Sequence, residues 1–493
     1  MEKSEGPRNI TLKVRAIRMK KIVLIISILI VLSIVAFIVY PTFEESKTDV
    51  LIIGAGAAGM SAAIEASDNG ANVILIEKMP TVGGNTAKAL DGINGSYTSV
   101  QELKNVPDSE GAYLEDALSA GHDKNDMDLI ATLVENSSGN IDWLTSLGVD
   151  LSDLVLLGGH TYPRTHRPSG DERVGTAITD ALENQILSRG IDLRKETKAI
   201  SLILDKEGKT VIGATVENPE GKIIDIKAKS VIIATGGFGG SQQVFVEYNE
   251  SLIGYETTNQ PGATGDFIHL TQALNVEYID MSFIQIHPTV EPDYGVHISE
   301  AVRGNGGILI DESGHRFVNE LELKDSLSET LVVLQSKTAY LLFDDKVRQS
   351  TKEVESYIDD RIVYTASSIE SLSGQLKIDP IILNQTIENY NTAYENGYDA
   401  EFGRTNLDHP LSGDNFYAIK VWPGVYYCIG GLPINEYAQV IGNDDAPIEG
   451  LYAAGEATGG IHGEDRLGGN SLAGAVAFGR IAGKHAAEKI TKN

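Results

Sequence analysis

Short apolar runs that lead into glycine-rich turns are spaced along the chain and predict buried strands. The first run, Asp49–Ile53, is followed by glycines and then by an alanine-rich helix predicted over Met60–Asn69. A second run, Asn72–Ile76, comes directly after that helix. A buried strand, a glycine turn, a helix and another buried strand form a βαβ unit with parallel strands. The beginning of this sequence therefore predicts an α/β nucleotide-binding fold.

Later parts of the chain extend this pattern. Further buried strands are predicted at Ser230–Ala234 and Gly450–Ala454, and both lead into glycine. A β-hairpin is predicted over Ser201–Val216, and helices are predicted over residues 130–148, residues 380–400 and Asn470–Lys489. Because strands of the same kind occur near both ends of the chain, we expect one nucleotide-binding domain built from both ends, with an insertion between them.

The N-terminus carries a different pattern. Residues 22–40 are 19 consecutive residues without a charged side chain, and as a helix they span about 28 Å, enough for the hydrocarbon core of a bilayer. Basic residues precede this run and acidic residues follow it. The positive-inside rule predicts that residues 1–21 are cytoplasmic and that the rest of the chain lies outside the cytoplasm. An uncleaved signal anchor is favoured, because no small-x-small cleavage site follows the run; a cleaved signal peptide remains the alternative.

Charge and cysteine content exclude several classes of function. The formal net charge is -29 at pH 7, whereas nucleic-acid-binding domains are typically basic. Cys428 is the only cysteine, so the chain has no internal disulfide, no C-x-x-C-H haem attachment and no cysteine-ligated iron–sulfur cluster. No metal site is predicted. If the protein does redox chemistry, its electrons must come from a separate carrier.

The strongest local motif is Gly54-x-Gly56-x-x-Gly59, which lies between the first predicted strand and its helix. Glycines at these positions let the backbone approach a pyrophosphate at the helix N-terminus. Glu77 ends the next strand, about twenty residues further on, where a carboxylate can bind the ribose hydroxyls. The buried strand before the glycines, the helix after them and the acidic Glu77 together indicate a dinucleotide-binding site.

Other segments carry a more specific resemblance: Gly83-Gly84-Asn85-Thr86, Ala234-Thr235-Gly236-Gly237, Gln260–Asp266 and Gly455-Glu456-Ala457-Thr458. With them, the chain from about Asp49 to its end resembles the FAD-dependent fumarate reductase/succinate dehydrogenase flavoprotein superfamily. Within it, the flavocytochrome c-type fumarate reductases and the urocanate reductases are most similar. The resemblance implies FAD as the cofactor, bound by Gly54, Gly56, Ala58, Gly59, Glu77, Lys78, Gly84, Asn85, Thr86, Gly92, Thr235, Gly236, Asp266, Gly455, Glu456, Ser471 and Leu472.

The same resemblance implies the domain organisation. We expect a Rossmann-like FAD-binding domain of the glutathione-reductase type over residues 48–281 and 427–493, with an inserted α+β capping domain over residues 282–426. In quinone-linked members a histidine attaches FAD covalently. Asn85 stands at that position here, so we predict non-covalent FAD.

Reduction of a double bond beside a carboxylate needs donors on the carboxylate, a hydride at the β-carbon and a proton at the α-carbon. In the resembling motifs Arg466 matches the arginine that binds the substrate carboxylate, and His287 matches a second residue that binds a carboxylate. Ser299 stands where the fumarate reductases have threonine, and it could donate to the same carboxylate. Glu300 and Arg303 match the pair that relays the proton. For each of these residues, an ordinary structural role is the alternative.

Two positions depart from the family pattern. Lys324 stands where the family has its proton-donating arginine, and Tyr426 stands where it has histidine. Lysine can donate a proton but has no planar fork, and a phenol offers one donor without positive charge. Leu156, Leu157 and His297 replace methionines. We therefore expect the substrate to be an enoate other than fumarate, such as a monocarboxylic or an aromatic one. Lys324 is the expected proton donor, and another group in that role is the alternative.

The resulting expectation is a membrane-anchored enoate reductase that takes electrons from an external membrane or surface carrier and acts outside the cytoplasm. Two alternatives remain. One is a dehydrogenase like the 3-ketosteroid dehydrogenases, which use tyrosines. The other is a flavin-binding electron shuttle or sensor without catalysis.

Overall fold

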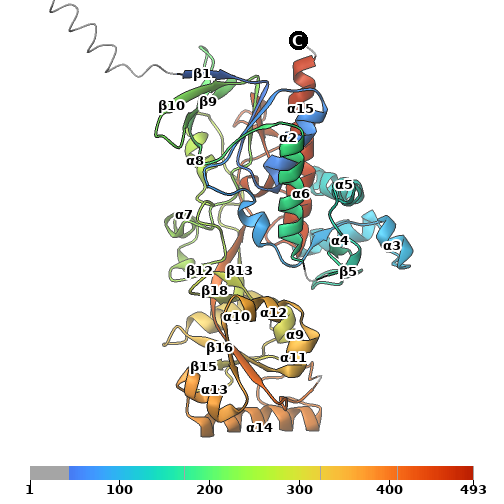
Figure 1. Ribbon diagram of the computed structural model, residues 1–493, viewed down its shortest axis with the longest axis vertical. Coiled ribbons are helices and arrows are strands. Elements are labelled where there is room, and N and C mark those ends of the chain that lie inside the picture. Colours follow the sequence, from blue (N-terminus) through green and yellow to red (C-terminus); the bar gives the residue numbers. More distant parts are fainter. Residues whose placement is uncertain (1–43, 171, 323, 408, 492–493) are drawn as a thin grey trace, which may run out of the picture.

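The computed structural model describes residues 44–491 except 171, 323 and 408. The predicted basic segment 1–21 and the predicted anchor at residues 22–40 lie outside the described residues. Among the described helices, none combines the length and the apolar character needed to cross a membrane. The molecule is elongated, with an upper region and a lower region in the view of Figure 1.

The upper region is built around a six-stranded sheet. Five of its strands are parallel, and the short edge strand β19 is antiparallel to β20. Residues of β2 and β3 are all buried, as expected for apolar strands covered on both faces. In spatial order the strands are β19 (Gln439–Ile441), β20 (Pro447–Ala453), β11 (Ser230–Ile233), β2 (Val50–Ile53), β3 (Val73–Ile76) and β7 (Asp192–Arg194).

The last helix of the chain packs lengthwise against the first helix of this region (Figure 1). These helices are α15 (Asn470–Thr491) and α2 (Ala57–Asp68). Glycines make this close packing possible, because a Cβ at Gly479 or Gly483 would lie 2.4 or 2.2 Å from the carbonyl oxygens of Ala58 and Ala62. The prediction that both ends of the chain build one sheet with its helices is confirmed.

Smaller elements surround this sheet. Beside it lie α3 (Ser99–Leu103), α4 (Glu110–Ala120), α5 (Met127–Ser146), α6 (Val174–Ser188), α7 (Gln242–Tyr248), α8 (Asp266–Leu270) and the 3₁₀ helices η1 (Gly84–Lys88), η2 (Glu250–Leu252) and η3 (Gly455–Ala457). A four-stranded sheet contains β1 (Glu44–Lys47), β10 (Ile223–Lys227), β9 (Val211–Glu217) and β8 (Lys198–Leu204), and a three-stranded sheet contains β4 (Ile93–Asn94), β6 (Thr165–Arg167) and β5 (Asp153–Val155).

The lower region, residues 284–428, is built on a second, seven-stranded sheet. Its strands are β12 (Glu256–Thr257), which comes from the upper region, β13 (Ile284–Glu291), β14 (Val296–His297), β15 (Ile308–Asp311), β16 (Ala339–Asp344), β17 (Val363–Ala366) and β18 (Phe416–Cys428). Its helices are α9 (Glu300–Gly304), α10 (Lys324–Val332), α11 (Asp345–Ser350), α12 (Glu353–Asp359), α13 (Ile369–Leu376) and α14 (Pro380–Asn396).

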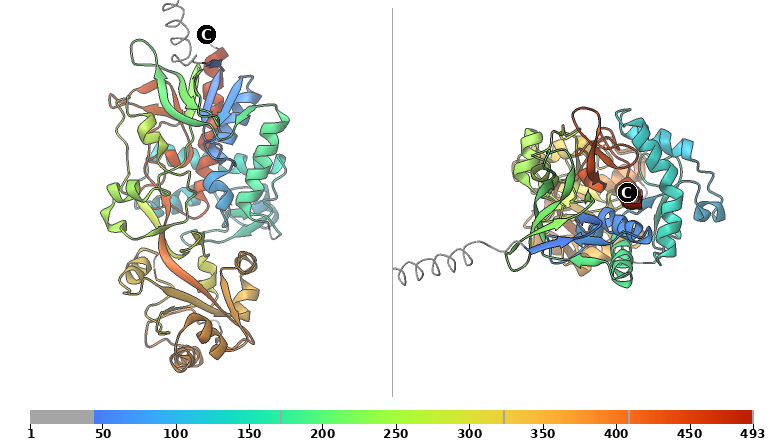
Figure 2. Two further views of the ribbon diagram at one scale, coloured as in Figure 1. Left: turned by 60° about the vertical axis from the view of Figure 1, so that its left-hand side comes forward. Right: turned by 90° about the horizontal axis from the view of Figure 1, so that it is seen from above.

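Alternation along these strands builds two separate small cores, one on each face of the sheet. Leu309 and Leu341 point into one core, and their neighbours Ile308 and Leu342 point into the other. The long strand β18 continues upward and pairs with β12 and β13 at the junction (Figures 1 and 2). The assignment of a separate capping domain with boundaries at 282 and 426 stays a prediction.

Element boundaries show one correction in the first motif. The helix predicted to begin at Met60 begins three residues earlier, at Ala57, directly after Gly56. The small residues of the glycine motif are therefore part of the first helical turn rather than of the preceding loop, because Ala57 and Ala58 adopt helical geometry without difficulty. The hairpin predicted around residue 207 is confirmed as β8 and β9.

Candidate active site

A cavity of about 320 Å³ opens at the carboxyl ends of the parallel strands in the upper region. A crevice at this edge is the usual ligand site of open α/β sheets. All the predicted cofactor residues except Gly59 and Gly92 line the cavity: Gly54, Gly56, Ala58, Glu77, Lys78, Gly84, Asn85, Thr86, Thr235, Gly236, Asp266, Gly455, Glu456, Ser471 and Leu472. Gly59 packs behind the lining on Gly54, and Gly92 packs on β6.

The turn between β2 and α2 tolerates only glycine at two positions. Gly54 has a φ of +108°, and a Cβ there would lie 2.3 Å from the carbonyl oxygen of Ala234. A Cβ at Gly59 would lie 1.8 Å from the carbonyl oxygen of Gly54. The helix therefore starts in close contact with the strand, and its N-cap Gly56 offers no side-chain oxygen to its first N–H groups. Such a helix start is suited to a phosphate.

Acidic residues line the other side of the nucleotide end. The two oxygens of Glu77 accept hydrogen bonds from the backbone N–H groups of Ala55 (2.9 Å) and Met79 (2.8 Å). Each carboxylate oxygen keeps a second lone pair, which can accept from a ribose hydroxyl. Lys78 pairs with Asp266 at 2.8 Å. Burial alone would raise the pKa of Asp266, but the hydrogen bond and charge of Lys78 outweigh it and hold that pKa below its ordinary value.

The polar groups along the middle of the cavity are suited to FAD. Within the described residues, the Thr235 hydroxyl is buried without a hydrogen-bond partner, and Thr235 lines the cavity. Asn85 is different, because its amide donates to Asn259 Oδ1 (2.6 Å) and Glu456 Oε2 (3.0 Å) and accepts from Gln260 N (2.8 Å). Asn85, which stands where quinone-linked members attach FAD covalently, is therefore fixed by hydrogen bonds to other residues of the protein.

At the far end of the cavity the lining changes from glycines to aromatic and basic side chains. The ring of His297 lies 4.1 Å from that of His287 and 5.0 Å from that of Tyr426, measured between centroids. The guanidinium carbon of Arg466 lies 5.9 Å from the centroid of Tyr426 and 4.3 Å from that of Tyr427. The structure thus brings together three of the predicted substrate residues, His287, Tyr426 and Arg466.

Several donors at this end are buried without a hydrogen bond. In the described part of the chain these atoms include Nε of cavity-lining Arg466 and Nε2 of His287, which lies beside cavity-lining His297; Nε and Nη2 of Arg303, outside the lining, also have no hydrogen bond. The other nitrogens of Arg466 donate to Gln285 Oε1 and to the Leu467 carbonyl, both at 2.8 Å. Since buried donors normally have acceptors, this concentration marks a place for an anionic ligand.

The histidines at this end are held neutral. Burial, then the nearby His297 and the charge of Lys324, hold the pKa of His287 well below its ordinary value. Burial also lowers the pKa of His297. Positive charge at the site therefore comes from arginine and lysine, while the histidines supply neutral donors.

The predicted proton relay is assembled in the lower region. Glu300 lies between two cations, with Oε1 at 3.5 Å from Lys324 Nζ and Oε2 at 3.6 Å from Arg303 Nη2. Arg303 is 3% exposed, whereas the Lys324 and Glu300 side chains are 33% and 48% exposed. Desolvation would raise the pKa of Glu300, but the charges of Lys324 and Arg303 outweigh it and lower that pKa. The three residues of the predicted relay therefore lie close together, with Lys324 and Glu300 partly exposed and Arg303 buried, and the relay itself stays a prediction.

Ser299 has a local structural role as the N-cap of α9. Its hydroxyl oxygen accepts from Ala301 N at 3.3 Å, and its own N–H donates to the Tyr357 hydroxyl at 3.0 Å. A hydroxyl that accepts at an N-cap still has its own proton to donate. The predicted contact between Ser299 and a carboxylate stays a prediction.

Comparison with known proteins identifies the family. The family described as "FAD binding domain" matches residues 49–472, most of the chain. This chain belongs to that family. This flavoprotein is 41% identical to the fumarate reductase (cytochrome) of Shewanella frigidimarina, over 91% of its own length and 78% of the relative's. It is 31% identical to the urocanate reductase of Eggerthella lenta, over 91% and 76%.

A solved structure gives the same result. The open conformation of a flavocytochrome c3 fumarate reductase aligns with a TM-score of 0.85 and 36% identity, covering 92% of this chain and 80% of that one. The flavoprotein is thus a member of the predicted superfamily, an FAD-dependent oxidoreductase with the expected mixed α/β FAD-binding fold.

Some residues at the site were not predicted. Gln285 orients Arg466, and it lies two positions before His287 in β13, so the period of two along a strand could have identified it. Asp91 follows cavity-lining Leu90, and its charge contributes to raising the pKa of Tyr426 after the larger effect of burial. No sequence signal marked Asp91. Leu156, assigned to the substrate neighbourhood, is 58% exposed.

Proposed function

We propose that this flavoprotein reduces the carbon–carbon double bond of an α,β-unsaturated carboxylate. The observation that carries the proposal is the pair of buried nitrogens without hydrogen bonds at the end of the FAD cavity, Nε of cavity-lining Arg466 and Nε2 of His287 beside cavity-lining His297. The relatives named as fumarate reductase and urocanate reductase support the same class of reaction.

In this proposal Arg466 binds the substrate carboxylate, with Gln285 fixing the plane of its guanidinium. His287 donates from Nε2 as a neutral ring, because its Nδ1 can accept from the backbone N–H of Thr289, which lies at 3.3 Å. These contacts draw electron density toward the carboxylate and so favour addition at the β-carbon.

The proton for the α-carbon would come from Lys324. Its ammonium donates one proton and is left as a neutral amine, which the partly exposed Glu300 reprotonates from solvent, while the buried Arg303 holds Glu300 on its other side. Reduced FAD, when bound, supplies hydride at the β-carbon. One hydride and one proton convert the double bond to a single bond, so the reaction balances.

We further propose that the preferred acid is not fumarate but an aromatic or monocarboxylic enoate. The ring planes of Tyr426 and His297 lie at 32° to each other, 5.0 Å apart, and offer a flat surface without a fixed positive charge. A second carboxylate would find less charge there, while a planar ring can stack. The electron donor is proposed to be a separate redox protein, since the single cysteine cannot ligate a cluster.

The location is proposed from the N-terminal sequence alone. A single helix at residues 22–40 would hold the enzyme in the cell membrane with its catalytic part outside the cytoplasm. Protease added to intact cells should digest the catalytic part. Full protection in intact cells, with digestion after lysis, would contradict this orientation.

Anaerobic reoxidation tests the function itself. The bound FAD is reduced chemically, and its reoxidation is followed by absorbance after adding fumarate, urocanate, cinnamate, methacrylate or acrylate. Rapid reoxidation by at least one acid is expected, with loss in Arg466→Met. Arg480→Met is the matched control, because Arg480 lies on α15 and pairs with Glu65 away from the cavity.

The other outcomes are equally informative. Reduced flavin that persists with every acid would contradict the reductase and favour an electron shuttle. Bleaching of oxidised flavin by a ketosteroid would favour the dehydrogenase. Faster reoxidation by fumarate than by the other acids would contradict the proposed preference for an aromatic or monocarboxylic acid.

A further inference from the structure

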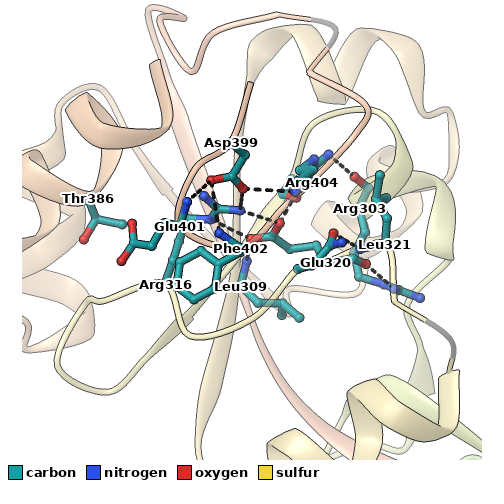
Figure 3. A network of polar contacts seen from close by, with 12 residues as sticks. Arg303, Leu309, Arg316, Glu320, Leu321, Thr386, Asp399, Glu401, Phe402 and Arg404 are labelled. Atoms are coloured by element: carbon teal, nitrogen blue, oxygen red, sulfur yellow. Dashed lines mark hydrogen bonds and ion pairs between the residues drawn. The ribbon is translucent and has the colours of Figure 1, made fainter. Parts of the chain in front are cut away.

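The lower region contains a buried network of ion pairs next to the proton relay (Figure 3). Glu320, which is fully buried, accepts two hydrogen bonds from Arg316, both at 2.9 Å, and one from Arg404 Nη1 at 3.1 Å. Arg316 also pairs with Asp399 at 3.0 Å. Two arginines and two carboxylates balance in charge, so the network does not need a further ion to be stable.

Within this network, Arg404 is the arginine that reaches α9, the helix that carries the relay. Its Nη2 donates to the carbonyl of Arg303 at 2.7 Å, and its Nη1 also donates to the carbonyl of Gly307 at 2.8 Å. The neighbouring Asn406 donates to the carbonyl of Gly304 at 3.1 Å. The last carbonyls of a helix have no partners inside it, and a cation there is favourable. Arg404 therefore fixes the C-terminal end of α9.

The Arg303 side chain is held from the same side. Its Nη1 donates to the backbone carbonyl of Glu320 at 2.6 Å, while Nη2 lies 3.6 Å from Glu300. The remaining guanidinium atom, Nε, has no hydrogen bond among the described residues. The position of Arg303 relative to Glu300 thus depends on the end of α9 and on Glu320, and Arg404 binds both.

We propose that Arg404 is a positioning residue that, with Glu320, sets the distance between Arg303 and Glu300 and so controls proton supply to Lys324. Arg404 is fully buried and lies beyond Arg303 from the solvent-exposed Glu300. It acts through the Arg303 backbone and the Glu320 carboxylate. This inference rests on the proposed function, because it assigns a task within the same proton path.

Arg404→Lys and Arg316→Lys form a matched pair of variants. Both arginines are buried and both bind Glu320, but only Arg404 also binds α9 carbonyls. Lysine keeps the charge and loses the fork. We expect Arg404→Lys to lower kcat about tenfold to a hundredfold, to leave KM nearly unchanged and to increase the solvent deuterium isotope effect. Arg316→Lys, which keeps the Arg404 bond to the Arg303 carbonyl, should lower the melting temperature and reduce kcat much less than Arg404→Lys does.

Hydrogen exchange of residues 300–307 gives a readout independent of turnover. Exchange in this segment should increase in Arg404→Lys and not in Arg316→Lys. If Arg404→Lys does not fold, Asn406→Ala, which removes only the bond to Gly304, should give the same changes at smaller size.

Equal loss of kcat in both lysine variants, a change in KM alone, or unchanged exchange in residues 300–307 would each overturn the positioning role. Failure of the proposed function looks different. In that case the wild-type protein reoxidises with no acid, while the exchange difference between the two variants persists.

Discussion

The two ends of the cavity are built in different ways. The nucleotide end consists largely of backbone and small side chains, with Gly54 and Gly59 in contacts that exclude any Cβ. The substrate end consists of long or aromatic side chains, such as His297, Tyr426 and Arg466. A site made of backbone recognises a constant ligand, whereas a site made of side chains can change its ligand by substitution.

The two ends also differ in how the chain assembles them. The phosphate-binding turn lies within one βαβ unit, and its geometry is set mainly by neighbours in sequence, with the backbone of Ala234 as a close contact from a distant strand. At the substrate end, β13, β14 and β18 supply His287, His297 and Tyr426, and the loop before α15 supplies Arg466. We infer that this end can diverge while the flavin site stays intact.

The largest expected effect comes from a single methyl group at the nucleotide end. Gly59→Ala would place a Cβ against the carbonyl oxygen of Gly54 and force α2 away from the strand. We expect complete loss of bound flavin, measured as visible absorbance of the purified protein. Gly139→Ala is the control, because Gly139 also lies in a helix, α5, but has open space around it. Full flavin content in Gly59→Ala would contradict this account.

At the substrate end, Lys324→Met should leave flavin content unchanged and lower the rate of reoxidation by about 10²- to 10⁴-fold, the usual contribution of a general acid. Lys346→Met, an exposed lysine of the same region, should keep the full rate. Lys324→Arg should retain activity, since arginine is the residue of the resembling family at this position. If Lys324→Met reoxidised at the full rate, the proton donor would have to be another group.

A smaller effect is expected for Tyr426→His. An imidazole beside Arg466 can take a proton when a second carboxylate binds, which a phenol cannot do. The rate with fumarate relative to that with cinnamate should rise about tenfold, or by about 1.4 kcal/mol of discrimination. Tyr426→Phe removes the hydroxyl without adding imidazole and should not raise this ratio. An unchanged ratio in Tyr426→His would show that this position does not select the substrate.

The sequence predicted the nucleotide end well because its determinants are local. The glycine spacing, the acid at Glu77 and the strand pattern all act within a single βαβ unit, where the largest boundary error is the start of α2, three residues earlier than predicted. The FAD cofactor and the family also followed from contiguous motifs. Non-covalent attachment, inferred from Asn85, stays a prediction.

The substrate end could be predicted only residue by residue, from the resembling motifs. Glu300, Arg303 and Lys324 do converge, but sequence gave no access to their distances. Arg404 and Asp91 went unnoticed because their contacts are with segments distant in the chain, Arg303 and Tyr426 respectively. Long-range contacts between side chains carry no periodic signal. The substrate roles assigned to all these residues remain predictions.

The smallest expected effect is a pH dependence that should be nearly absent. Burial lowers the pKa of both His287 and His297, and that of His287 lies well below its ordinary value, so we expect His287 to stay neutral in the free enzyme. If the free enzyme needed a histidine that was already protonated, with an ordinary pKa near 6.5, kcat/KM would fall roughly 25-fold between pH 6 and pH 8. We expect instead that the ratio of kcat/KM for wild type to kcat/KM for His287→Gln changes by less than about twofold between pH 6 and pH 8. A ratio that falls steeply with pH would mean that His287 binds the carboxylate as a preformed cation. The substrate end would then resemble the nucleotide end, because its charges would be fixed before the ligand binds.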